Sequence, residues 1–90
     1  MARIAVEPGD QSSYLVTVHD GDRRTTHAVT VTSQDLDRYA PAGTTAERLL
    51  QASFEFLLER EPASAILSTF ALPVIERYFP EYPREIRKRI

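Results

Sequence analysis

The sequence predicts an α+β domain: a three-stranded antiparallel β-meander over residues 1–32, then a helical part over residues 33–90 with one long helix and short proline-initiated helices. Two observations support this prediction. Stretches of alternating apolar and polar residues, rich in β-formers, fill the first third of the chain. Prolines then recur at positions where each can begin a helix. Ninety residues suit a single domain, and three strands with one apolar face need helices to cover it.

The three predicted strands are residues 3–7, 14–19 and 26–32. A three-residue loop at 9–11 would pair Val6 with Tyr14, and an even-length second loop would pair Val16 with His27. In this register one face of the sheet collects the apolar side chains Ile4, Val6, Tyr14, Val16, Val18, Val29 and Val31. A shift by one residue would scatter them over both faces, so the pattern favours a single buried face.

Capping signals predict two helices after the third strand. Ser33 is expected to cap a short helix that ends at Tyr39. Thr44 and Glu47 form a capping-box pattern, which predicts a helix running to about Glu61. This long helix is expected to cover the sheet with an apolar stripe of Leu50, Phe54, Leu57 and Leu58, which Leu49 and Phe56 widen.

Three prolines predict short helices in the last third of the chain, at residues 62–70, 73–79 and 83–90. Proline is favoured at the first helical position because its missing N–H has no partner there in any case. The first two of these helices are expected to bury Ile66, Leu67, Phe70, Val74, Ile75, Tyr78 and Phe79.

The composition favours a cytoplasmic protein without a membrane partner. The net charge of −2 gives no general attraction to nucleic acid or to anionic membranes. A small secreted domain would usually be linked by disulfides, and this chain has no cysteine. The first residues lack the apolar run of a signal peptide, and no window approaches the roughly 18 apolar residues of a membrane span.

No constellation of residues predicts an enzyme, a metal site or a cofactor. His19 and His27 fall on opposite faces of the predicted sheet, whereas a metal site needs roughly three or more converging ligands. We expect His27 to be a sheet-edge residue with a local hydrogen bond. The paired carboxylates lie in turns and at helix ends, where capping and solvation explain them. We therefore expect a protein without catalytic activity.

Two features of the C-terminal segment favour partner binding. The first is a basic cluster, Arg84, Arg87, Lys88 and Arg89, which either complements a helix dipole or docks an acidic partner or nucleic acid. The second is the pair Phe79 and Tyr82, which either packs in the core or, if exposed, anchors an interface. The core of a chain this small is modest. The first hypothesis is therefore a non-enzymatic binding or assembly module with a protein partner or self-association.

The segment 26–61 supports an alternative hypothesis. A Thr/Val strand, a short helix, a glycine turn and a capped helix follow in the order of a ribbon–helix–helix DNA-binding unit. The residues that would contact DNA are Arg23, Arg24, Thr30 and Thr32. This hypothesis competes with the negative net charge, because a basic face is the usual footprint of nucleic-acid binding.

The C-terminal half contains a specific succession of short motifs: ASFEFLLEREP at 52–62, SAIL at 64–67, VI at 74–75 and YFPEY at 78–82. This succession resembles a family of short uncharacterised bacterial proteins. The resemblance implies a bacterial origin and a shared fold, and it supplies no catalytic residues. A looser similarity to HicB-type antitoxins rests on the strand-rich start and the ribbon–helix–helix-like segment, and it implies an antitoxin-type regulator.

Overall fold

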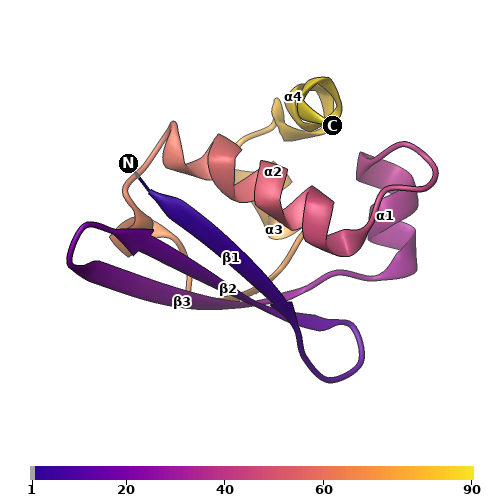
Figure 1. The fold of residues 1–90 in the computed structure, drawn as a ribbon. Helices are drawn as coiled ribbons and strands as arrows, with labels where there is room; N and C mark the ends of the chain where they lie inside the picture. Colours follow the sequence, from indigo (N-terminus) through magenta and orange to yellow (C-terminus); the bar gives the residue numbers. More distant parts are fainter. Residues whose placement is uncertain (1) are drawn as a thin grey trace.

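A four-stranded sheet with helices packed on one face forms the fold of residues 2–90, the part of the chain that the computed structural model describes (Figure 1). The strands lie in the order β1 (Arg3–Pro8), β2 (Ser13–Asp20), β3 (Arg23–Thr30) and β4 (Thr69–Ala71). The helices are α1 (Ser33–Tyr39), α2 (Ala46–Leu58), α3 (Val74–Tyr78) and α4 (Tyr82–Arg89), with a 3-10 turn, η1, at Ala63–Ala65. The α+β class predicted from the sequence is confirmed, but the sheet has one strand more than predicted and is mixed.

The first two hairpins build the predicted apolar face, although one register differs from the prediction. In β2 and β3, Val16 lies opposite His27 as predicted. In β1 and β2, Val6 lies opposite Val16 and not opposite Tyr14, a shift of two residues. The shift arises because the turn is centred on Gln11, one residue later than predicted, with the Gly9 N–H donating to the Ser13 carbonyl at 2.8 Å. Side chains alternate with a period of two, so this shift leaves every apolar residue on the predicted face.

The fourth strand replaces the helix predicted at 62–70. Only η1 is helical there, and the chain then extends so that β4 pairs in parallel with β3, with Phe70 opposite Val29. Pairing satisfies backbone groups on the edge of β3 that would otherwise lack partners: the Ala28 N–H donates to the Ser68 carbonyl at 2.8 Å. Leu67, which the predicted helix would have buried, is 46% exposed.

The helix ends differ from the predicted caps by small shifts. Thr32, and not Ser33, caps α1 in a reciprocal capping box with Asp35. Thr45, and not Thr44, caps α2, accepting a hydrogen bond from the Arg48 N–H at 3.0 Å. Helix α2 ends at Leu58, before the predicted Glu61, because the N–H groups of both residues 60 and 61 turn back to the Leu57 carbonyl.

Helix α2 is buried on two sides because it lies between the sheet and α4 (Figure 1). On the sheet side, the Phe54 ring contacts the His27 ring at a centroid distance of 5.3 Å. On the other side, the Phe56 ring meets the Tyr82 ring of α4 at 5.4 Å and the Phe79 ring at 5.9 Å. Phe56, which the sequence places beside the main stripe, therefore forms a second buried side of α2 that α4 covers. Within residues 2–90, no helix is both long and apolar enough to cross a membrane.

Candidate functional site

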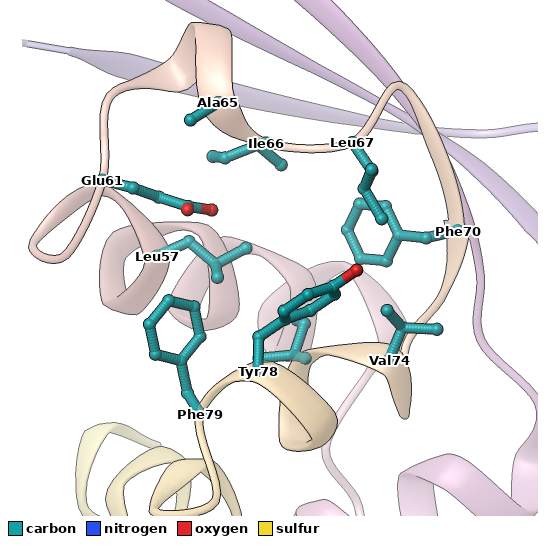
Figure 2. Close-up of a pocket in the computed structure, with 10 residues that line it drawn as sticks. Leu57, Glu61, Ala65, Ile66, Leu67, Phe70, Val74, Tyr78 and Phe79 are labelled. Atoms are coloured by element: carbon teal, nitrogen blue, oxygen red, sulfur yellow. The ribbon is translucent and has the colours of Figure 1, made fainter.

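An apolar pocket of about 380 Å³ lies between the end of α2, the segment from η1 to β4, and α3 (Figure 2). Its volume falls within the range of ligand-binding clefts, roughly 300–1,000 Å³. None of its lining residues belongs to the two hairpins: Leu57, Glu61, Ala65, Ile66, Leu67, Phe70, Val74, Ile75, Tyr78 and Phe79. Packing of short elements that cannot interdigitate closely leaves this hollow beside the core.

Leu67 and Tyr78 are large apolar side chains of the pocket lining that are exposed to solvent. Their exposed fractions are 46% and 67%. Figure 2 shows the Tyr78 ring reaching across the pocket toward Phe70 and Leu67. Among the described residues the third large apolar side chain with such exposure is Leu15, at 42%, on the outer face of the sheet. Contiguous exposed apolar surface, unlike a scattered residue, marks a binding site.

His27 binds the backbone of Leu67, a residue at the rim of the pocket. Its side chain is buried on β3, and its Nδ1 lies 2.8 Å from the Leu67 carbonyl oxygen. Its Nε2 lies 2.9 Å from the Thr25 hydroxyl, so both ring nitrogens have partners. Because a carbonyl can only accept, Nδ1 carries a proton and donates to Leu67. The expected local hydrogen bond is the one to Thr25. The expected edge position is wrong, since β3 lies between β2 and β4, and the second bond of His27 reaches Leu67, forty residues away.

Glu61 supplies the charge in the pocket lining. Figure 2 shows its carboxylate directed into the pocket from the side opposite Phe70. No cation of residues 2–90 lies within ion-pair distance of this carboxylate. The neighbouring Arg60 is turned away, with its guanidinium 3.1 Å from the Glu81 carboxylate and 3.7 Å from the centre of the Phe56 ring. The pocket therefore combines apolar walls with one negative group.

Strand β4 presents an open edge beside the pocket. The Ala28 N–H reaches the Ser68 carbonyl, and the Leu72 N–H reaches the Thr30 carbonyl. In a parallel ladder this pattern directs the backbone groups of the intervening residues, Thr69 and Ala71, away from β3. β4 is the last strand of the sheet, and both residues are exposed. The opposite edge strand, β1, carries charged side chains and Pro8, which disfavour the pairing of another strand.

The predicted partner residues Phe79 and Tyr82 separate in the structure. Tyr82 is completely buried, and its hydroxyl lies 2.7 Å from the Ser53 hydroxyl, so the ring is not available to a partner. Burial raises the pKa of the Tyr82 hydroxyl above its usual range. Phe79 is half-buried, packs edge-on against Phe56 and lines the pocket. Only Phe79 of this pair lies at the candidate site.

The basic residues of α4 are divided between internal contacts and solvent. Arg89 donates two hydrogen bonds to the Glu59 carboxylate, and these bonds lower the pKa of Glu59. Arg87 donates to the Arg38 carbonyl, which ties α4 to α1. Arg84 and Lys88 are exposed, and each lies within 4 Å of Glu85. This arrangement agrees with a cationic helix end that complements the dipole.

The residues of the DNA-binding alternative do not form a free ribbon. Arg23, Arg24 and Thr30 are exposed on β3, but this strand has neighbours on both sides, β2 and β4. In ribbon–helix–helix recognition the strand pair enters the groove on its own. Thr32 uses its hydroxyl to cap α1. The geometry therefore does not favour this hypothesis over binding at the pocket.

The titratable groups of the pocket are the Glu61 carboxylate and the Tyr78 phenol. Within residues 2–90, no three side chains of histidine, cysteine, aspartate or glutamate are grouped to hold a metal ion. Glu61, Leu67 and Tyr78 are not among the site residues predicted from the sequence, because the pattern between the prolines predicts that the last two lie in helix cores. No local signal in the sequence separates Leu67 and Tyr78 from Phe70 and Tyr82, which are buried.

Comparison of the chain with models of known protein families, with curated proteins and with solved structures finds no match in any of the three.

Proposed function

We propose that this protein is a non-enzymatic binding module that holds an extended segment of a partner protein in the pocket and along β4. The observation that supports this proposal most strongly is the clustering of Leu67 and Tyr78, both exposed, at a pocket of about 380 Å³. Exposed aromatic and aliphatic side chains around a concave site are typical of interface anchors. The proposal keeps the protein-binding function expected from the sequence and, of the residues predicted for it, retains Phe79 at the pocket and leaves out those of α4.

The open edge of β4 favours an extended peptide as the occupant. A strand added beside Thr69 and Ala71 would satisfy their outward backbone groups, which is the mode of peptide binding called strand addition. Alternate side chains of such a peptide would point to the same side as Phe70 and enter the pocket. The edge is only three residues long, so we expect the pocket to supply most of the affinity.

A second copy of this chain fits the pocket less well. Beyond the pocket itself, the exposed large apolar side chain in the described structure is Leu15, which lies on the outer face of the sheet among its hairpin partners. Insertion of Leu15 of one copy into the pocket of another would be a head-to-tail contact, which forms a ring or an open filament. A heterologous protein partner avoids this consequence.

The test is selection of random nonapeptides displayed on phage, followed by affinity measurements on synthetic versions of the selected sequences. Wild type is expected to bind with affinities in the micromolar range, and Leu67→Ser or Tyr78→Ser is expected to weaken binding about tenfold or more, as loss of an anchor does. Leu15→Ser is the matched control, since it removes an equally exposed apolar side chain from the other face. Equal binding by all three variants, or no selected peptide, would contradict the proposal.

The binding mode has its own test. Methylation of single backbone nitrogens in a selected peptide removes one donor at a time. Strand addition predicts that binding falls at every second position only, because alternate N–H groups face β4. A uniform response along the peptide would exclude strand addition while leaving the pocket as the site.

A further inference from the structure

The pocket has the character of a receptor for a long basic side chain. Its walls are apolar, with Leu57, Ile66, Phe70 and Phe79 among them, and Glu61 carries the negative charge. Lysine and arginine have a complementary character, because each carries a cationic head on an apolar stem. Figure 2 shows the Glu61 carboxylate pointing into the space between Ile66 and Leu57, so a side chain in the pocket would meet the apolar walls and the charge together.

We propose, on the basis of the function proposed above, that the partner segment carries a lysine or arginine whose stem lies in the pocket and whose cationic head pairs with Glu61. A neighbouring apolar residue of the same segment packs on Leu67 and Tyr78 at the mouth. Charge complementarity selects this occupant over a wholly apolar one, because a wholly apolar side chain would bury the Glu61 carboxylate without a partner.

The contrast with neighbouring carboxylates supports the assignment of Glu61. Glu59 lies two residues before it in the sequence, and Glu81 lies in the C-terminal segment. Each is paired with an arginine of this chain, Arg89 and Arg60 respectively. Those pairs join α2 to the C-terminal segment and have a structural role. Glu61 comes one residue after Arg60, yet it faces the pocket and has no such partner among residues 2–90. An exposed aromatic ring, that of Tyr78, lies in the same pocket, and aromatic faces also attract cations.

The experiment is a double-mutant cycle between Glu61 and the basic residue of a peptide selected by the wild-type protein. The peptide is synthesised with that residue as lysine and as norleucine, which keeps the stem and lacks the charge. Wild type is expected to prefer lysine about tenfold, and Glu61→Gln is expected to remove this preference. Glu55→Gln is the matched control, because it makes the same change of net charge at an exposed position of α2 outside the pocket.

Each outcome distinguishes this inference from the function on which it rests. Selected peptides that bind at the pocket but contain no basic residue, or a lysine preference that survives Glu61→Gln, would overturn the inference and leave the binding module intact. A loss of preference in Glu55→Gln as large as in Glu61→Gln would assign the effect to the general field of the protein and would also overturn it. Absence of any selected peptide, or dimers that only pocket variants dissociate, would overturn both.

Discussion

The buried pair Tyr82 and Ser53 allows a stability prediction in which the direction of one hydrogen bond decides the outcome. The Ser53 hydroxyl lies 2.7 Å from the Leu49 carbonyl oxygen and 2.7 Å from the Tyr82 hydroxyl, and both side chains are completely buried. A serine hydroxyl has one proton, and the Leu49 carbonyl can only accept it. Tyr82 must therefore donate its proton to Ser53.

This direction makes the two single substitutions unequal. Tyr82→Phe keeps the ring against Phe56 and removes a donor whose acceptor remains bonded to Leu49, so we expect a loss of about 1 kcal/mol of unfolding free energy. Ser53→Ala leaves the Tyr82 hydroxyl buried without an acceptor, which should cost about 2 kcal/mol. In the double variant both polar groups are gone, so its loss should be well below the sum of the two.

Urea unfolding followed by far-ultraviolet circular dichroism measures these differences, and a change of about 1 kcal/mol corresponds to roughly 4–8 °C in Tm for a domain of this size. Tyr78→Phe is the control, since its hydroxyl belongs to an exposed ring, and it should leave the stability unchanged. The proposed direction of the hydrogen bond is wrong if Ser53→Ala is no more destabilising than Tyr82→Phe, or if the loss of stability in the double variant equals the sum of the two single losses.

Three further predictions concern stability. Burial and the hydrogen bond to the Glu76 carboxylate raise the pKa of Tyr39 from 10.0 to about 12. The stabilisation of the fold by the neutral phenol is therefore complete below pH 10 and is lost between pH 10 and 12, with a slope of at most about 1.4 kcal/mol per pH unit. Tyr39→Phe should reduce this slope, as measured by urea midpoints across the same pH range. Thr45→Ala should cost about 1 kcal/mol because it removes the cap of α2, whereas Thr44→Ala should cost little; equal effects in thermal unfolding would contradict the assignment of the cap. His27→Leu should cost about 1–3 kcal/mol because the Leu67 carbonyl loses its donor, and it should also weaken binding at the pocket; unchanged urea midpoints would show that this bond does not hold the rim.

Much of the sheet could be predicted from the sequence because the side chains of a strand alternate between the two faces of the sheet, so a register shift by an even number of residues leaves the buried face unchanged. Val6 pairs with Val16 and not with Tyr14, yet the apolar face is the one predicted, since a two-residue shift returns each side chain to the same side. The four α-helices were similarly predictable to within a few residues, because Thr/Glu and Pro signals act locally. Their exact caps were not, since Thr44 and Thr45 offer the same hydroxyl, and only the path of the chain selects between them.

The fourth strand could not be predicted in the same way. A short apolar run such as residues 66–72 is compatible with a helix or with a buried strand, and local signals do not separate them. The choice is made by a distant element: the edge of β3 offers unpaired backbone groups, and His27 offers a donor to the Leu67 carbonyl. The helix predicted at 62–70 has no comparable set of partners.

The sequence by itself determined the α+β class, the buried face of the hairpins, and the helical segments that cover it, because periodicity and capping are properties of neighbouring residues. Tertiary structure alone decided the strand β4 and the pocket. Leu67 and Tyr78 belong to residue types that are commonly buried, as are Phe70 and Tyr82, and no local pattern distinguishes the exposed pair from the buried pair. Exposure depends on which elements reach a side chain, and that is set by packing between segments far apart in the chain.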